Sequence, residues 1–245
     1  MHNEQTAPTA PVAPTEEKGQ RAAEIHRAYN FVGGWGSQRY DAMMSGATWL
    51  GRLALRLFWQ LSPAQYEAFL TQMFAGLPRD FAGRLLEVPV GTGVLSLPHY
   101  VGLPQANITC LDYSEGMLAA ARQRAHILEL DDIHFQQGDV GALPFADDSF
   151  DLVLSVNGLH AFPDKEAALR ESQRVLRPGG TFTGCLYIRG ESRITDLFVR
   201  TFCTWRGYFT PPYEDYASLR THLGQYFPEV TLTRVASFAG FTCHK

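Results

Sequence analysis

The residues of this chain that could do chemistry begin with a short glycine-containing run, Glu87-Val88-Pro89-Val90-Gly91-Thr92-Gly93. Glycines allow a backbone to approach a ligand closely, and a helix that starts after such a loop offers amide N–H groups and the positive end of its dipole. This arrangement suits a carboxylate or a phosphate group. Taken alone, the run also fits a tight strand-to-helix turn that binds nothing.

Two acidic residues further along the chain restrict the class of ligand that the loop could bind. Asp112 lies about twenty residues beyond the loop, the separation at which an acid can accept hydrogen bonds from ribose hydroxyls. It could instead be only a helix N-terminal acid beside Ser114. Ser96 stands where a dinucleotide-binding loop has glycine or alanine, which disfavours a nicotinamide cofactor without excluding it. Asp139 can accept a hydrogen bond from an adenine amino group while Val140 packs on the ring.

Alternating apolar runs and helical patterns must position these residues. Five runs predict buried strands, and they cover residues 84–88, 108–111, 133–136, 152–156 and 181–186. Helical patterns over 115–130 and 165–176 separate them, and Pro178-Gly179-Gly180 is expected to end the second helix. The order predicts a mostly parallel, doubly wound α/β sheet that binds ligands at its carboxyl edge. Two final strands, 230–235 and 238–243, are joined by so short a link that they must be antiparallel.

Four motifs occur in this order, and together they resemble the class I methyltransferases that use S-adenosyl-L-methionine (SAM), especially the ubiquinone/menaquinone-biosynthesis-like branch. The motifs read EVPVGTG, LDYSEGML, GDVGALPFADDSFDLVLS and RVLRPGG, within residues 84–190. The segment Tyr40-Asp41-Ala42-Met43-Met44-Ser45 also resembles the helix before the sheet in that branch. The resemblance implies a Rossmann-like, seven-stranded mixed sheet and SAM as the cofactor.

The resemblance also implies which residues hold the cofactor. The methionine part would lie against Glu87, Pro89, Gly91, Thr92, Gly93 and Asn157. Asp112 would accept the ribose hydroxyls, and the adenine would lie against Tyr113, Met117, Asp139 and Val140. Pro89 departs from the family pattern because it replaces the first glycine of the loop. Proline has no N–H to donate, so one contact to the cofactor carboxylate would be lost or remade.

Methyl transfer from a sulfonium is an in-line displacement, so the protein mainly positions the acceptor and a base is optional. His160 follows the fourth expected strand, and an imidazole can accept a proton at neutral pH. A packing or cofactor-supporting role is the alternative for this histidine. Tyr40 is a weaker candidate for the catalytic group.

Aromatic residues predict the walls of the acceptor site. They come from the N-terminal helices and from an insert after the fifth strand, which carries Phe202, Trp205, Tyr208 and Phe209. Many of these side chains are expected in the core, and the remainder indicate a covered apolar site. We expect methylation of a small aromatic or isoprenoid-like acceptor on carbon or oxygen. A SAM-binding protein of this fold that catalyses another reaction, or senses the cofactor, is the alternative.

Composition restricts the other function classes. The net charge is −4 without a Lys/Arg cluster, which disfavours nucleic acid as a partner. Four separated cysteines indicate neither a metal site nor a disulfide framework. No apolar stretch is long enough to span a membrane, so we expect a cytoplasmic protein of undetermined oligomeric state. The expected organisation is a disordered tail (1–20) and one domain (21–245), with a helical lid (21–77), a cofactor-binding core (84–190) and an aromatic cap (191–226).

Overall fold

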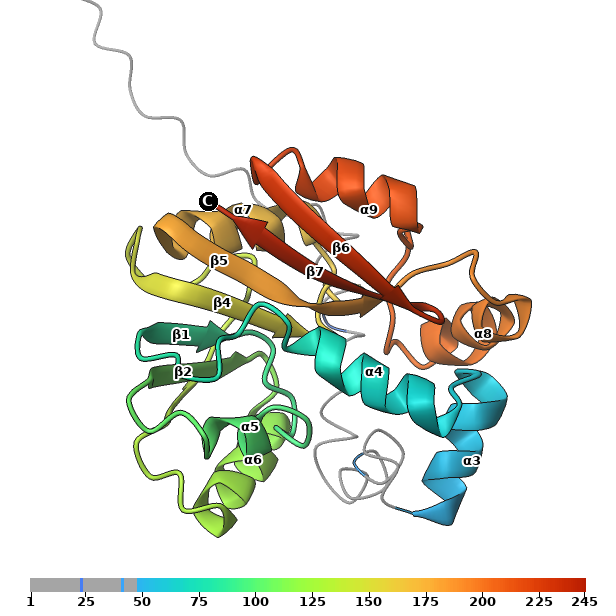
Figure 1. Ribbon diagram of the computed structural model, residues 1–245, viewed down its shortest axis with the longest axis horizontal. Coiled ribbons are helices and arrows are strands. Elements are labelled where there is room, and N and C mark those ends of the chain that lie inside the picture. Colours follow the sequence, from blue (N-terminus) through green and yellow to red (C-terminus); the bar gives the residue numbers. More distant parts are fainter. Residues whose placement is uncertain (1–22, 24–40, 42–47) are drawn as a thin grey trace, which may run out of the picture.

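A central sheet of seven strands organises the computed structural model, which describes residues 23, 41 and 48–245 (Figure 1). The strands are β1 Arg84–Glu87, β2 Asn107–Asp112, β3 His134–Gln137, β4 Phe150–Val156, β5 Leu176–Tyr187, β6 Glu229–Val235 and β7 Phe238–His244. Their order is β3-β2-β1-β4-β5-β7-β6, with β1 to β5 parallel and β7 antiparallel to both neighbours. The expected mixed sheet is confirmed. The expected tail and, apart from residues 23 and 41, the part of the expected lid before residue 48 lie outside the described residues.

Helices cover both faces of the sheet (Figure 1). They are α3 Trp49–Phe58, α4 Pro63–Met73, α5 Leu97–Tyr100, α6 Glu115–Ile127, α7 Lys165–Val175, α8 Arg193–Phe198, the π-helix η1 Val199–Cys203 and α9 Tyr216–Leu223. Ser62 begins α4 as expected, because its hydroxyl accepts the Gln65 N–H while the Gln65 side chain accepts the Ser62 N–H. This reciprocal pair satisfies two N–H groups that the first turn leaves unpaired.

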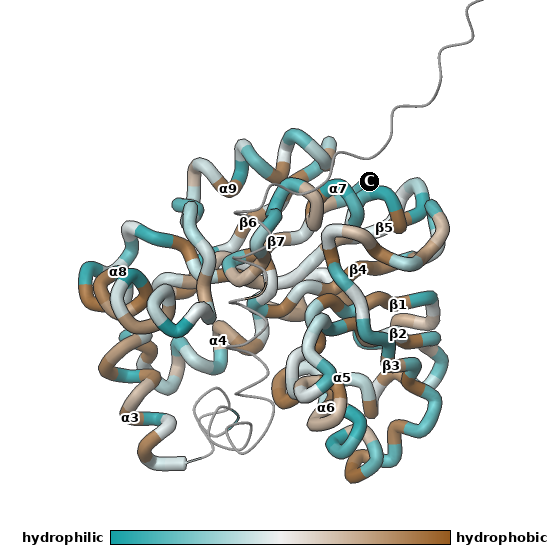
Figure 2. Tube along the Cα trace, turned by 180° about the vertical axis from the view of Figure 1, so that it is seen from behind, coloured by the Kyte–Doolittle hydropathy of each residue, from teal (hydrophilic) through white to brown (hydrophobic). Residues whose placement is uncertain are grey.

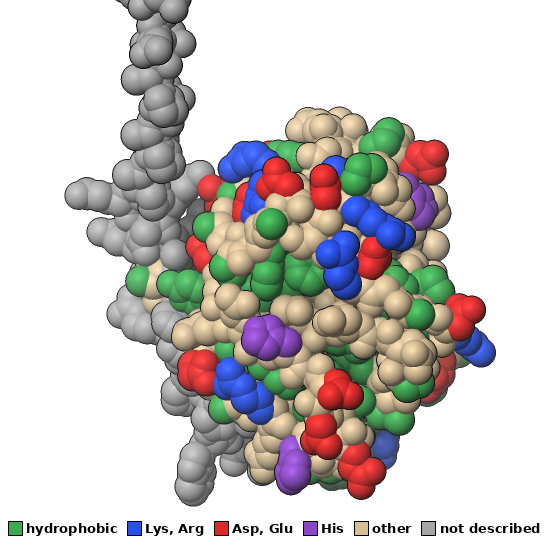
Figure 3. Space-filling model, turned by 90° about the vertical axis from the view of Figure 1, so that its left-hand side faces the viewer, with side chains coloured by type: hydrophobic (Ala, Val, Ile, Leu, Met, Phe, Trp, Pro, Cys, Tyr) green, Lys and Arg blue, Asp and Glu red, His purple; other side chains and the backbone are tan. Residues whose placement is uncertain are grey.

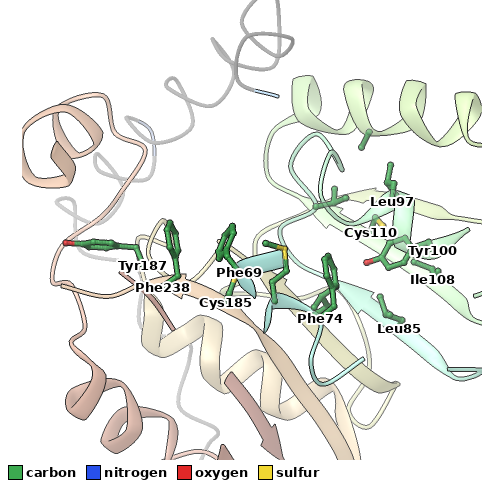
Figure 4. Close-up of a cluster of buried hydrophobic side chains, with 14 of the residues drawn as sticks. Phe69, Phe74, Leu85, Leu97, Tyr100, Ile108, Cys110, Cys185, Tyr187 and Phe238 are labelled. Atoms are coloured by element: carbon green, nitrogen blue, oxygen red, sulfur yellow. The ribbon is translucent and has the colours of Figure 1, made fainter. Parts of the chain in front are cut away.

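Alternate residues of each strand enter two separate apolar cores, because successive side chains of a strand point to opposite faces. Leu85 packs into the core beneath α4, α5 and α6, while Leu86 packs into the core beneath α7 and α9. Figure 4 shows the first core, where Phe69 of α4 lies against Phe238 of β7 with ring centroids 4.4 Å apart. Burial on both faces explains why these strands read as continuous apolar runs.

The fifth strand begins earlier than its sequence predicts. Strand β5 starts at Leu176, directly after α7, and it contains the Pro178-Gly179-Gly180 run, whereas the sequence placed the start of the strand at residue 181. The register against β4 shifts between the pairs Phe150↔Leu176 and Leu152↔Thr181, and Gly179 has a φ of 76°. A bulge of this kind accommodates proline and a left-handed glycine without leaving the sheet. The helix does end before this run, at Val175, but the predicted start of the strand was too late.

The outward face of α3 also differs from expectation. Leu50, Leu53 and Leu57 recur at helical spacing and form a helix as predicted, but all three are exposed, whereas Leu61 beyond the helix is buried. Helical periodicity identifies a face of a helix without showing whether protein or solvent lies against it.

Gly184 in β5 should be essential to the sheet. An added Cβ would lie 2.0 Å from the Ser155 carbonyl oxygen of β4, a backbone atom that cannot rotate away. We expect Gly184→Ala to lower the free energy of unfolding by about 1–3 kcal/mol, as overpacking does elsewhere. Urea unfolding measures this. Gly102→Ala is the control, because its Cβ would meet nothing closer than 3.5 Å. Equal stability of the two variants would contradict the packing described here.

Candidate functional site

A cavity of about 1110 Å³, including its opening to solvent, lies at the carboxyl ends of the parallel strands. Four chain segments line it: 87–96 after β1, 111–117 after β2, 138–140 after β3 and 156–163 after β4. Strand β1 lies between β2 and β4, so the order of the strands reverses there and the crossovers on its two sides leave a crevice. A cavity of this size accommodates a ligand as large as a nucleoside.

The glycine loop is held across the ends of its neighbouring strands. The Val88 N–H donates to the Leu154 carbonyl at 2.9 Å, on the β4 side. The Val90 N–H donates to the Leu111 carbonyl at 3.0 Å, on the β2 side. These bonds fix the loop where the expected ligand would lie. The sequence predicted a helix whose positive dipole end faces the loop. The following helix, α5, begins at Leu97 and has only four residues, so its dipole is weak.

Pro89 packs against the segment after β4. A Cβ at Gly158 would lie 2.4 Å from Pro89 Cδ, so the close approach of these segments requires glycine at 158. Gly91 and Gly93 have φ values of 56° and 67°, the left-handed region that favours glycine. A Cβ on Gly91 would meet no atom within 4 Å, because this residue borders open space. The loop is therefore open at the position where a ligand could contact its backbone.

Asp112 connects the glycine loop to the next helix. Its Oδ2 accepts the Gly91 N–H at 2.8 Å, and its Oδ1 accepts the Ser114 N–H at 2.9 Å. The Ser114 hydroxyl in turn caps α6 by accepting the Met117 N–H. Burial raises the pKa of the Asp112 carboxyl to about 6, against the opposing effect of these N–H groups. The carboxylate is mainly ionised at neutral pH, and each oxygen keeps a lone pair for a further donor.

Glu87 lies at the floor of the cavity. Its carboxyl is buried and accepts the Tyr100 hydroxyl at 2.8 Å, with the Cys110 thiol 3.7 Å away. Burial raises the pKa of Glu87 to about 8, so the group is mainly protonated at neutral pH. A protonated carboxyl can donate one hydrogen bond as well as accept others. Glu87 can therefore meet an acceptor or a donor from the ligand.

The opposite side of the cavity offers one apolar surface and one polar edge. Met117 is buried and Tyr113 is half exposed, and both line the cavity from the segment after β2. Val140 is buried on the β3 side. Asp139 is exposed, and its Oδ1 accepts the Gly141 N–H at 2.8 Å. A flat ring could lie between these apolar groups with its polar edge toward Asp139.

Asn157 lies at the end of β4 with a φ of 55°. Its N–H donates to the Cys185 carbonyl at 2.9 Å, and its Oδ1 lies 3.5 Å from the Cys185 thiol. Its buried Nδ2 has no hydrogen-bond partner among the described residues. An unpartnered buried amide costs free energy until an acceptor reaches it. Asn157 lines the cavity, as do all the other residues nominated from sequence for the cofactor.

The two residues nominated for catalysis are placed differently. Tyr40 lies outside the described residues. His160 is buried and is absent from the residues that line the cavity. Its Nδ1 accepts the Tyr187 N–H at 3.1 Å, and its ring stacks on Phe209 with centroids 3.8 Å apart. Burial, with the nearby charge of Lys165, lowers the pKa of His160 to about 3. The imidazole is neutral and carries its hydrogen on Nε2.

One contact beside the cavity was not anticipated. Asp41 accepts the Thr92 hydroxyl at 2.5 Å and forms an ion pair with Arg124 of α6 at 2.5 Å. Arg124 also donates to the Thr92 carbonyl. Asp41 is thereby attached to the glycine loop and to α6. Asp41 belongs to residues 40–45, which resemble the helix before the sheet in the family. Its partner Arg124 lies 83 positions further along the chain, so no local sequence pattern could have predicted the pair.

Metal-binding clusters and membrane-spanning helices are absent from the described part of the chain. Among residues 23, 41 and 48–245, no group of three or more His, Cys, Asp or Glu side chains could hold a metal ion. No helix in this portion is long and apolar enough to cross a membrane. All four cysteines are buried and free.

Comparison with known proteins identifies the family. The family described as "Methyltransferase domain" matches residues 86–183. The ubiquinone/menaquinone biosynthesis C-methyltransferase UbiE of Methylobacterium nodulans is 34% identical over 194 residues, which cover 76% of this chain and 68% of that protein. The demethylmenaquinone methyltransferase of Listeria monocytogenes is 30% identical over 175 residues, which cover 65% of this chain and 73% of that protein.

This chain is a SAM-dependent methyltransferase of the ubiquinone/menaquinone type. The assignment excludes the nicotinamide-dependent alternative, which Ser96 had already disfavoured. Members of this family depend on SAM.

Solved structures confirm the fold of the methyltransferase. A SAM-dependent methyltransferase of Thermotoga maritima, titled a possible histamine N-methyltransferase, superposes with a TM-score of 0.63 at 19% identity, over 90% of this chain and 99% of that chain. The cyclase SpnF superposes with a TM-score of 0.61 at 18% identity, over 74% of this chain and 80% of that chain. Identities this low show the architecture and leave the reaction to the site itself.

Gly91 should contribute to SAM binding because it leaves space for the ligand beside the backbone of the loop. Gly91 and Gly179 both have left-handed φ values, and an added Cβ meets no atom within 4 Å in either case. Alanine at each position should lower stability by about 1–2 kcal/mol through backbone strain. Only Gly91→Ala should weaken SAM binding, by about tenfold, the equivalent of about 1.4 kcal/mol. Calorimetric titration measures this, and equal affinities in the two variants would contradict the placement of the cofactor.

Proposed function

We propose that this enzyme binds SAM in the described cavity and transfers its methyl group to a ring carbon of a small hydroquinone that carries an isoprenoid chain. Two findings support the proposal. The chain is 34% identical to a ubiquinone/menaquinone biosynthesis C-methyltransferase over 194 residues, 76% of its length. The cavity brings the nominated cofactor residues together from four chain segments.

The residues around the cavity fit the chemical groups of SAM. The open backbone at Gly91 and the unpartnered Asn157 amide suit the carboxylate and ammonium end. The Asp112 carboxylate, which retains free lone pairs, would accept the ribose hydroxyls. Met117 and Val140 would pack on the adenine, with Asp139 at its polar edge. In this arrangement the loop that follows β4 would help to hold the methionine end of the cofactor through Asn157.

SAM supplies an electrophilic methyl group. In the proposed transfer, the methyl–sulfur bond breaks as a bond forms to the ring carbon, and that carbon then loses its proton to water or buffer. S-adenosylhomocysteine and one proton are the other products. The electron-rich hydroquinone supplies the nucleophile, so the enzyme contributes mainly position.

The acceptor side of the cavity is apolar. Ala161, Phe162 and Pro163 follow β4 and line the cavity beyond Asn157. An aromatic ring packs favourably on such a surface, whereas a charged acceptor would lose its hydration there. The names of the relatives and this surface both favour a quinone-type acceptor.

We further propose that His160 positions the site and does not act as a base. A base accepts a proton on a free lone pair, and the Nδ1 lone pair of His160 is occupied by the Tyr187 N–H. The His160 carbonyl accepts the Thr210 N–H at 2.9 Å, and its ring stacks on Phe209. These contacts join the loop after β4 to β5 and to the aromatic insert.

The proposed reaction is tested by comparing acceptors. We expect the purified enzyme to methylate a dithionite-reduced demethylmenaquinone with a short isoprenoid chain. Its kcat/KM should exceed those for catechol and for histamine by about tenfold or more, the range that pocket contacts give. Mass spectrometry should show one methyl group on carbon and one equivalent of S-adenosylhomocysteine. Preference for catechol or histamine would contradict the acceptor, and product without S-adenosylhomocysteine would contradict methyl transfer.

The role of His160 is tested by a pair of variants. The Oδ1 of asparagine can replace Nδ1 as acceptor for the Tyr187 N–H, whereas alanine cannot. We expect His160→Asn to keep kcat within about threefold and to leave its pH profile unchanged, because general base catalysis contributes about 10²–10⁴-fold. His160→Ala should lose stability because a buried N–H becomes unpaired. A loss of a hundredfold or more in kcat for a folded His160→Asn would show that the imidazole is the base.

A further inference from the structure

Two neighbouring helices expose a continuous apolar surface. On α3 the exposed residues are Trp49, Leu50, Leu53 and Leu57. On α8, η1 and the turn that follows they are Ile194, Leu197, Phe202 and Trp205. Phe58 of α3 stacks on Phe198 of α8 with ring centroids 4.5 Å apart, which joins the two groups. We call these eight residues, with Phe58, the α3–α8 surface; Figure 2 shows both helices side by side with frequent apolar positions.

The exposed apolar residues follow the periodicity of their helices. Leu50, Leu53 and Leu57 recur every three or four residues on the outside of α3, while Leu55 on its inner side is buried. Ile194 and Leu197 are exposed on α8, while Val199, at the start of η1, is buried. Each helix is therefore apolar on its outer as well as its inner side. An outer apolar side of this extent marks a binding surface.

The charge of the same helices is opposite to that of the whole protein. Residues 48–59 and 192–206 contain Arg52, Arg56, Arg193, Arg200 and Arg206, and Asp196 is their only acidic residue. Asp196 is directed inward, because its carboxylate accepts the Tyr187 hydroxyl at 2.6 Å and the Gly190 N–H at 2.9 Å. The chain as a whole has a net charge of −4.

Another face of the molecule lacks this combination. The face shown in Figure 3, which is turned away from α3 and α8, has acidic and basic side chains side by side. Basic residues among Trp, Leu and Phe are typical of helices that lie in a membrane interface. The long arginine side chains can reach phosphate groups while their stems lie along the apolar surface.

We propose that the α3–α8 surface docks on an anionic phospholipid membrane, with its apolar side chains in the headgroup region and its arginines on lipid phosphates. A second copy of the chain is a poorer occupant. In a twofold dimer this surface would meet itself and bring ten arginines together, which like-charge repulsion opposes. An acidic protein approaching an anionic membrane would be repelled on its other faces, so the charge also orients the protein. The inference does not depend on the identity of the methyl acceptor.

Vesicle sedimentation tests the docking. The full-length enzyme is mixed with vesicles of phosphatidylcholine and phosphatidylglycerol, or of phosphatidylcholine alone. We expect binding to the anionic vesicles that weakens as salt screens the arginines. Neutralising Arg56 or Arg200 to Gln should each reduce partitioning about fivefold, the equivalent of about 1 kcal/mol per basic residue. Arg170→Gln, which changes an exposed arginine on α7, is the charge control and should bind as the wild type does.

Apolar variants complete the test. Leu57→Ser and Leu197→Ser should each lower partitioning by about tenfold, because each removes buried methyl and methylene groups. Ile127→Ser is the control, since Ile127 is 72% exposed on α6 but lies outside this surface. Circular dichroism and SAM affinity establish that each variant is folded.

Three results would overturn the proposal. The first is an absence of binding to anionic vesicles by the folded enzyme. The second is binding that Leu57→Ser and Leu197→Ser leave unchanged. The third is a dimer, seen by light scattering without lipid, that these two variants convert to monomers. This last result would assign the surface to a second copy.

Discussion

The buried carboxylate of Asp112 is the interaction on which the cofactor cavity depends. One oxygen holds the Gly91 N–H of the loop after β1, and the other holds the Ser114 N–H at the start of α6. Two segments that are distant in sequence are thus fixed at one point. Charge-assisted hydrogen bonds inside a protein are stronger than neutral ones, so a single ionised group can fix this geometry. Met117 owes its position in the cavity wall to the same junction, through the Ser114 cap.

The other wall depends on the end of β4. Asn157 adopts a left-handed conformation there, and Gly158 allows the chain to pass close to Pro89. His160 then joins this loop to Tyr187 of β5 and to Phe209 of the insert. The residues nominated for the cofactor and the proposed acceptor surface therefore share one support. A proline in the glycine loop is accommodated because the segment opposite it is a glycine.

The exposed apolar and basic residues of α3 and α8 are consistent with the acceptor proposed for the cavity. An apolar cavity suits an apolar acceptor, and such acceptors with isoprenoid chains partition into membranes. The proposed docking of α3 and α8 would place the enzyme where such a molecule is concentrated. The two proposals have separate physical bases, because one rests on the cavity and the other on exposed leucines and arginines on two helices.

The sequence by itself determined the alternation of strands and helices, the seven-stranded sheet and the set of residues around the cavity. The alternation of strands and helices follows from local periodicity. The set of residues around the cavity followed from the resemblance of four ordered motifs to a methyltransferase family. The tertiary structure alone decided three other features. It showed β5 running through Pro178-Gly179-Gly180, since a bulge depends on the neighbouring strand. It turned the leucines of α3 outward and left His160 with an occupied Nδ1, because exposure and hydrogen-bond partners depend on residues far along the chain.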